Sequence, residues 1–192
     1  KTKAVVPVYF GGMPLKMENL KKIAREKSLS IIEDAAHACG TKNKNNNVGS
    51  ENELCCFSFH PIKNLSMPKG GAITINANNS KNIKKKLNSL RWCGIDKRLG
   101  ALYDVTSLGY NYYMEEISAS IGIEQLKKLQ RSNKKRYSIA KRYSTELNVN
   151  KKMPLDKNCS YHLFWIRVNN REKFMDKMRK NGIETGAHYP PV

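Results

Sequence analysis

The sequence has few acidic residues, no long apolar run and none of the histidine spacings that usually bind zinc. Only 16 Asp and Glu stand against 35 Lys and Arg in 192 residues, which gives a formal net charge of +19. No stretch approaches the roughly 20 apolar residues of a membrane-spanning helix. The four histidines form neither H-x-x-H nor H-E-x-x-H. We therefore expect no membrane segment and no metal.

The five cysteines are odd in number and include no C-x-x-C pair. Cys55 and Cys56 lie in an apolar, strand-like stretch, where a reduced thiol buried in the core is the ordinary interpretation. Disulfides are rare in cytosolic proteins. The cysteine content therefore favours a reducing compartment, and we expect a cytoplasmic protein.

The excess of positive charge has two interpretations. A basic surface can bind nucleic acid or another anionic partner. Against this, Lys greatly outnumbers Arg, Asn is abundant, and the lysines are scattered over several polar segments. Proteins that recognise nucleic acids specifically use Arg and interleaved aromatic residues. We favour a compositional bias and expect no nucleic-acid partner.

The predicted elements are those of an α/β fold. A strand at 4–10, a helix at 18–27 and a strand at 29–33 form a βαβ unit, which requires parallel strands. Residues 94–110 predict a loop. The other predicted elements are strands at 53–59, 72–76, 161–168 and 182–189, and helices at 80–91, from 115, around 140–147 and at 171–180.

Two predicted strands end near residues whose side chains can take part in catalysis. Asp34 follows one strand, and Ser58 and Lys63 stand at or beyond the end of another. Ligands of open α/β sheets gather at the carboxyl ends of strands. A lysine amine can hold an aldehyde as a Schiff base, and a carboxylate can keep a pyridine nitrogen protonated. A pyridoxal 5′-phosphate (PLP) enzyme needs these two groups.

Each of these residues also has a plainer interpretation. An Asp that ends a strand is more often a helix N-cap, and a Ser there bonds to backbone. His37 could contact the cofactor's phenolic oxygen or ring, or it could be a satisfied, partly buried histidine. Lys63 differs from a surface lysine because its neighbours are apolar, and desolvation makes an amine nucleophilic. Those neighbours are Phe59, Pro61, Ile62 and Leu65.

Short motifs occur along the whole chain in one order and spacing: VPVYFGG (6–12), EDAAHA (33–38), VGS (48–50), FSFHPIKN (57–64), GGAI (70–73), LGYNY (108–112), GIET (182–185) and HYP (188–190). Together they resemble the DegT/StrS-type sugar aminotransferases, a family of the fold type I PLP enzymes. The resemblance implies that Lys63 carries the cofactor and moves protons. It implies that Asp34 pairs with the pyridine nitrogen, that His37 lies beside the ring and that Ser58 binds the phosphate.

Three further positions match with implied roles outside the chain's own cofactor site. Asn111 would reach the phosphate site of the neighbouring subunit in a homodimer with composite active sites, and His188 and Tyr189 would lie near the sugar substrate. Two positions depart from the family pattern: Tyr113 replaces an Arg before Met, and Lys69 replaces an acid before the paired glycines.

The resemblance implies part of a fold type I aminotransferase. Residues 1–134 would form a partial large cofactor-binding domain, mainly parallel sheet with helices, and 135–192 a partial small α+β C-terminal domain. No Met opens the chain, and the family's N-terminal phosphate turn and ring-stacking aromatic have no counterpart. We expect a central and C-terminal fragment that is inactive alone.

The implied activity is transamination of a nucleotide-linked keto-sugar, with an amino acid such as glutamate as donor. This chemistry belongs to amino sugar biosynthesis for cell-surface polysaccharide. One alternative is a sugar dehydratase of the same family, in which histidine replaces the lysine. Another is a regulatory or nucleic-acid-binding protein on the same scaffold. The intact pair of Asp34 and Lys63 favours the aminotransferase.

Overall fold

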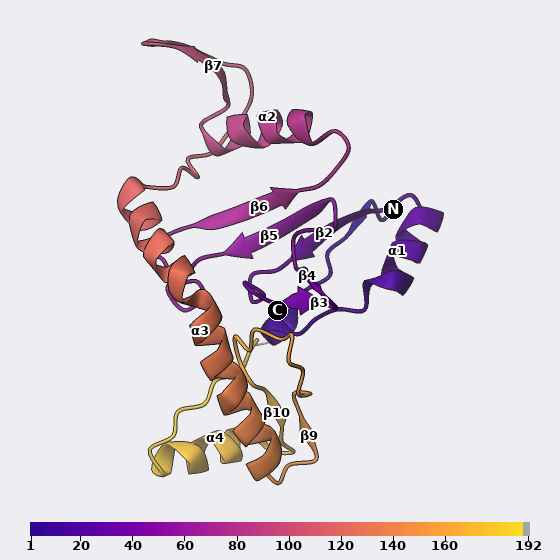
Figure 1. Ribbon diagram of the computed structural model, residues 1–192, viewed down its shortest axis with the longest axis vertical. Helices are drawn as coiled ribbons and strands as arrows, with labels where there is room; N and C mark the ends of the chain where they lie inside the picture. The colour runs from indigo at the N-terminus through magenta and orange to yellow at the C-terminus, as the bar shows by residue number, and fades with distance from the viewer. Residues whose placement is uncertain (190–192) are drawn as a thin grey trace.

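The computed structural model of the chain describes residues 1–189, and its centre is a four-stranded sheet in the order β1–β2–β5–β6 (Figure 1). The strands β1 (Ala4–Val5), β2 (Ser30–Asp34) and β5 (Leu54–Ser58) run parallel, and β6 (Gly71–Ile75) is antiparallel to β5. Helix α1 (Met17–Glu26) connects β1 to β2. The predicted α/β class and its βαβ unit are confirmed.

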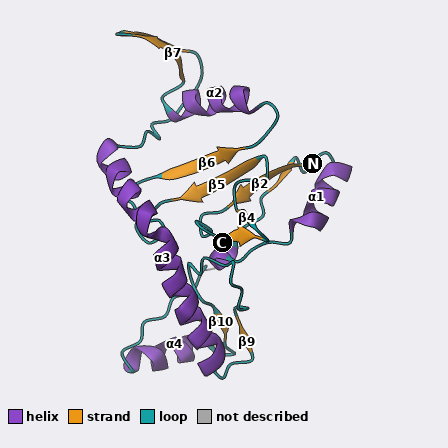
Figure 2. Cartoon of the chain, viewed as in Figure 1, coloured by secondary structure: helices purple, strands orange, loops and turns teal. Residues whose placement is uncertain are grey.

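Helices lie at the margins of this sheet (Figure 2). Helix α2 (Ser80–Arg91) follows β6 at the predicted residues. Helix α3 (Glu116–Glu146) runs past the sheet and far beyond it, and α4 (Arg171–Lys180) lies near its distal end (Figure 1). Within residues 1–189, no helix is both long and apolar enough to cross a membrane.

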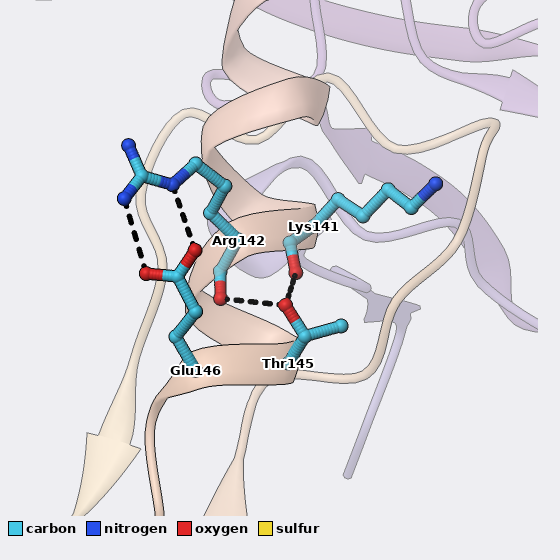
Figure 3. A network of polar contacts seen from close by, with 4 residues as sticks. All are labelled: Lys141, Arg142, Thr145 and Glu146. Atoms are coloured by element: carbon cyan, nitrogen blue, oxygen red, sulfur yellow. Dashed lines mark hydrogen bonds and ion pairs between the residues drawn. The ribbon is translucent and has the colours of Figure 1, made fainter.

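The long helix α3 replaces the two separate helices that the sequence predicted. It is continuous over 31 residues and therefore contains position 134, where we placed the domain boundary. Its last turn carries an exposed ion pair between Arg142 and Glu146, with Nε to Oε1 at 2.9 Å (Figure 3). The Thr145 hydroxyl bonds the carbonyls of Lys141 and Arg142 at 3.1 Å each. The predicted domain boundary at position 134 thus falls inside a helix, and the division into two domains stays a prediction.

Short hairpins account for elements that the sequence analysis missed. Strands β7 (Ile95–Leu99) and β8 (Leu102–Val105) form an antiparallel hairpin inside the predicted loop, and it projects away from the sheet (Figure 1). A smaller hairpin joins β3 (Lys42–Asn43) to β4 (Asn46–Asn47). The polar sequence of the smaller hairpin and the charged, glycine-containing sequence of the larger one concealed them.

Two predicted strands are wrong. Of residues 161–168, only β10 (Ile166–Arg167) is a strand, paired with β9 (Lys151–Lys152), and residues 182–189 contain no strand. In the segment 161–168, His162 donates its backbone N–H to the Gly11 carbonyl at 2.9 Å instead of to a neighbouring strand. Tertiary contacts outweighed the β propensity of these aromatic and branched residues.

A buried polar cluster holds this segment against the sheet. The hydroxyls of Thr41 and Ser160 lie 2.9 Å apart, and both residues are about 1% exposed or less. Thr41 donates to the Gly12 carbonyl at 2.7 Å, and Ser160 donates to the His37 carbonyl at 2.9 Å. We call these four residues the Ser160 cluster. It joins the C-terminal part of the chain to the loops at the carboxyl end of the sheet.

The apolar core is divided between two clusters of buried residues. The first lies against the sheet and includes Tyr9, Val48 and Cys55. The second lies against the distal half of α3 and includes Ala140 and Met153. Apolar side chains of α3 nearer the sheet are uncovered, with Ile123 and Leu126 each 58% exposed. These two residues line a cavity of about 1120 Å³ between α3 and the sheet.

Replacing Ser160 with Ala should destabilise the protein, because the buried His37 carbonyl would lose its donor. The expected loss in the free energy of unfolding is about 1–3 kcal/mol, measured by urea denaturation. Ser138→Ala is the matched control, since that hydroxyl bonds a helix carbonyl at the surface. Equal losses for the two variants would contradict a structural role for the Ser160 cluster.

Candidate active site

Strand register brings Asp34 and Ser58 to the same face and edge of the sheet. Asp34 pairs directly with Cys56 across the parallel strands β2 and β5, and Ser58 lies two residues further along β5. Side chains two residues apart on a strand share a face. Both residues are partly buried. The Ser58 hydroxyl accepts a bond from the His60 N–H at 3.3 Å.

Asp34 is not a helix N-cap. One carboxylate oxygen accepts the N–H of Ala36 at 2.9 Å, which closes a turn, and the residues after it form turns and short strands. Among residues 1–189, its other oxygen has no hydrogen-bond partner. The carboxylate is therefore held in place by its own turn and keeps an oxygen for a ligand.

Lys63 lies in the irregular loop between β5 and β6 and is partly buried. Its backbone N–H donates to the His60 carbonyl at 2.8 Å. Burial lowers the pKa of its amine, and the negative charge of Asp34 opposes that shift. The interaction shows that the amine and the carboxylate share one electrostatic environment. A lowered pKa leaves more of the amine uncharged and nucleophilic at neutral pH.

His37 is buried and its ring has a partner on both nitrogens. The Gly11 N–H donates to Nδ1 at 3.2 Å, so in the neutral ring the proton resides on Nε2. Nε2 lies 3.1 Å from the hydroxyl of Tyr189. Burial and the positive charge of Lys63 lower the pKa of His37, and Asp34 raises it. His37 is therefore a neutral group beside the lysine.

The sequence analysis did not identify His162, whose ring lies 4.3 Å from that of His37, centroid to centroid. Its Nδ1 lies 3.1 Å from Oδ1 of Asn64. Burial, followed by the charges of His37 and Lys63, lowers the pKa of His162 to about 4. It was overlooked because it stands inside the stretch that predicted a strand. No local pattern in the sequence sets it apart from its aromatic and branched neighbours.

The structure brings together most of the predicted site residues. Lys63, Asp34 and His37 interact electrostatically, and His188 acts on the pKa of His37 as well. Asn111 is different: it is exposed, and its backbone pairs with that of Trp92 beyond the projecting hairpin. Within residues 1–189, Asn111 has no side-chain hydrogen bond to the other predicted site residues. Pro190, the last residue of the HYP motif, lies outside the described residues.

The large cavity is not part of this site. It is lined by Phe57, which alternates with Cys56 and Ser58 along β5 and therefore points to the opposite face. Ala72 and Thr74 of β6, which also line it, pair with Phe57 and Cys55 and share that face. Among the described residues, no group of three or more His, Cys, Asp or Glu could hold a metal ion. The candidate site is thus the face that carries Asp34, Ser58 and Lys63.

Residues 1–192 match the DegT/DnrJ/EryC1/StrS aminotransferase family. The chain belongs to that family. An uncharacterized protein of Methanocaldococcus jannaschii is 35% identical over all of this chain and 54% of its own length. The chain therefore spans about half the length of the relatives that it matches.

Solved members of the aminotransferase family have the same fold. PseC of Helicobacter pylori, described as an aminotransferase of pseudoaminic acid biosynthesis, is 28% identical with a TM-score of 0.87, over 100% of this chain and 53% of that one. The putative sugar aminotransferase Spr1654 of Streptococcus pneumoniae, in its PMP form, is 26% identical with a TM-score of 0.91, over 100% and 55%. DesV of S. venezuelae, solved with a ketimine intermediate, is 28% identical with a TM-score of 0.87, over 99% and 51%.

The lowered pKa of His162 predicts a pH dependence of stability. In the unfolded chain His162 takes up a proton near pH 6.5, whereas the folded protein resists protonation down to about pH 4. Its contribution to stability is therefore intact above pH 6.5 and is lost as the pH falls toward 4. Unfolding free energies at pH 7 and pH 5 should differ more for the parent than for His162→Gln. An NMR titration midpoint near 6.5 for His162 would contradict this assignment.

Proposed function

We propose that this chain is part of a PLP-dependent sugar aminotransferase, whose substrates are a nucleotide-linked keto-sugar and an amino-acid donor such as glutamate. The observation that carries the proposal is the arrangement of Asp34 and Lys63. A carboxylate with a free oxygen and a partly buried amine interact at one edge of the sheet. The match to the aminotransferase family over the whole chain supports it.

The residues of the site fit PLP. The free oxygen of Asp34 suits a protonated pyridine nitrogen, since a charge-assisted hydrogen bond favours the charged ring. The amine of Lys63 suits covalent attachment to the aldehyde, and the Ser58 hydroxyl suits the phosphate. Nε2 of His37 carries a proton that it can donate to the phenolic oxygen. When bound, PLP supplies an electron-withdrawing ring that makes a neighbouring carbon-bound proton acidic.

The chain's own part in the chemistry is proton transfer and orientation. With its lowered pKa, the Lys63 amine can accept a proton near neutral pH and return it as an ammonium, as a general base and then a general acid. The free carboxylate oxygen of Asp34 would hold the ring nitrogen by a hydrogen bond. The lowered pKa values of His37 and His162 keep both rings neutral, so neither adds a positive charge beside Lys63.

The sugar side of the site would be formed by His188 and Tyr189. The Tyr189 hydroxyl lies 3.1 Å from Nε2 of His37, which supports a role for this segment beside the proposed cofactor site. Arg136 acts on the pKa of His162 and is therefore a nearby cation for a diphosphate. Spr1654 is described as a putative sugar aminotransferase, which supports a sugar substrate, and PseC as an aminotransferase involved in the biosynthesis of pseudoaminic acid.

A homodimer with composite sites would account for the exposed position of Asn111. Asn111 is exposed in its own chain. Apolar side chains around it are also exposed, as an interface between subunits requires. They include Leu99, Leu102, Leu108, Tyr112 and Ile117.

The full-length protein with PLP should absorb visible light, and borohydride should then link the cofactor irreversibly to the peptide that contains Lys63. Lys63→Ala should lose the label and lower transamination by many orders of magnitude, because covalent attachment is lost. Mass spectrometry of digested protein locates the label. Lys69→Ala, an exposed lysine in the same loop, is the control and should keep both. A label on another lysine in the parent would overturn the proposal.

Mixing two inactive variants, Lys63→Ala and Asn111→Ala, should restore activity if Asn111 acts in the partner's site. Random exchange of subunits gives hybrids with one intact site, so activity should return to about a quarter of the parent's. Steady-state transamination after verified subunit exchange provides the measurement. If exchange occurs and no activity returns, Asn111 does not serve the partner's site.

A further inference from the structure

The residue after the lysine, Asn64, uses its whole side-chain amide in contacts with distant segments. Its Nδ2 donates to Oδ1 of Asn133 at 2.9 Å and to the Ser160 carbonyl at 2.7 Å. Its Oδ1 lies 3.1 Å from Nδ1 of His162. An amide has two N–H donors and one carbonyl acceptor, and all are engaged here. The partners come from α3 and from the segment of the Ser160 cluster.

Asn133 extends this contact to the other half of the site. Its Nδ2 donates to the Cys39 carbonyl at 3.0 Å, in the loop that begins directly after Asp34, the last residue of β2, and carries His37. The amides of Asn64 and Asn133 therefore bridge the loop of the lysine and the loop of the aspartate. His162 forms a second bridge, because it contacts both Asn64 and the ring of His37.

We propose that Asn64 is a positioning residue, which fixes the lysine loop against the aspartate loop and so sets where the amine of Lys63 stands. The proposal rests on the proposed function for its catalytic consequence. Adjacent residues have Cα atoms only 3.8 Å apart, so the hydrogen bonds that hold Asn64 also restrain the backbone of Lys63. Misplacing a reacting group by about 1 Å can cost on the order of a hundredfold in rate.

The hydrogen bonds of Asn64 also explain how Lys63, a loop residue, keeps a partly buried amine. The loop from 60 to 69 has no regular secondary structure and contains two prolines. The buried Leu65 and Met67 also anchor this loop. Without the Asn64 contacts, the part of it around Lys63 would be freer to shift toward solvent. The pKa of Lys63 would then rise toward that of an ordinary lysine, since burial is what lowers it.

The test uses the full-length protein without cofactor and measures the pKa of the Lys63 amine. Trace acylation over a range of pH, followed by mass spectrometry of the Lys63 peptide, gives the midpoint. Asn64→Ala should raise that midpoint by about 0.5–1 pH unit. Asn133→Ala, which leaves the loop sequence intact, should raise it by less.

The matched control is Asn76→Ala. Asn76 is exposed, but its side-chain amide also donates two partly buried bonds to carbonyls, of Gly49 and Asn52 at 2.9 Å each. It follows β6, and its backbone N–H bonds the Glu53 carbonyl at 2.9 Å, at the end of the sheet opposite Ser58. It should lower stability while leaving the Lys63 midpoint unchanged. With PLP and substrates, Asn64→Ala should lower kcat by about tenfold or more with little change in KM.

The outcomes separate this inference from the proposed function. If the parent binds no PLP but Asn64→Ala still raises the Lys63 midpoint, the function fails and the positioning role stands. If the parent binds PLP and neither Asn64→Ala nor Asn133→Ala moves the midpoint, the positioning role is wrong. A rise of the same size in Asn76→Ala would mean general loosening and would also overturn it.

Discussion

The structure depends on one close approach, where the segment around Ser160 lies against the turn at Gly11 and Gly12. Gly12 has φ of +87°, and a Cβ at this position would stand 2.2 Å from the Ser160 hydroxyl and 2.8 Å from the His37 carbonyl. Only glycine permits both the conformation and the contact. The buried hydroxyls satisfy carbonyls that would otherwise lose water without compensation. A segment more than a hundred residues distant thereby becomes part of the sheet's carboxyl edge.

This approach determines which residues surround the lysine. The Ser160 carbonyl accepts a bond from Asn64, and His162 follows two residues later with its ring against His37. The chain then passes through α4 and returns so that Tyr189 reaches the same histidine. The contacts of Asn64 and Tyr189 are hydrogen bonds between partly buried groups and are therefore directional. The site is consequently assembled from segments far apart in the chain, with the sheet supplying only Asp34 and Ser58 directly.

Strand alternation separates two adjacent acids into different roles. Glu33 points to the opposite face, where it is 0% exposed and accepts a bond from the Tyr9 hydroxyl at 2.9 Å and another from Asn52. Burial and Glu33 together raise the pKa of Tyr9 well above its usual value. Asp34 points to the site face, is partly buried and keeps a free oxygen. One carboxylate is therefore enclosed in the core and its neighbour is available for chemistry.

By itself, the sequence determined the α/β class, the helices α1, α2 and α4, and the family. It could do so because period-2 and period-3.6 patterns and short motifs are local properties. It also predicted Asp34 and Lys63, which stand where predicted strands end. The continuous α3, the failure of the strand at 161–168 and the roles of Asn64 and His162 could not be predicted in this way. Tertiary structure decided the last three, because they depend on hydrogen bonds between residues 69 to 151 positions apart, from Asn64–Asn133 to His162–Gly11, and no local pattern encodes such partners.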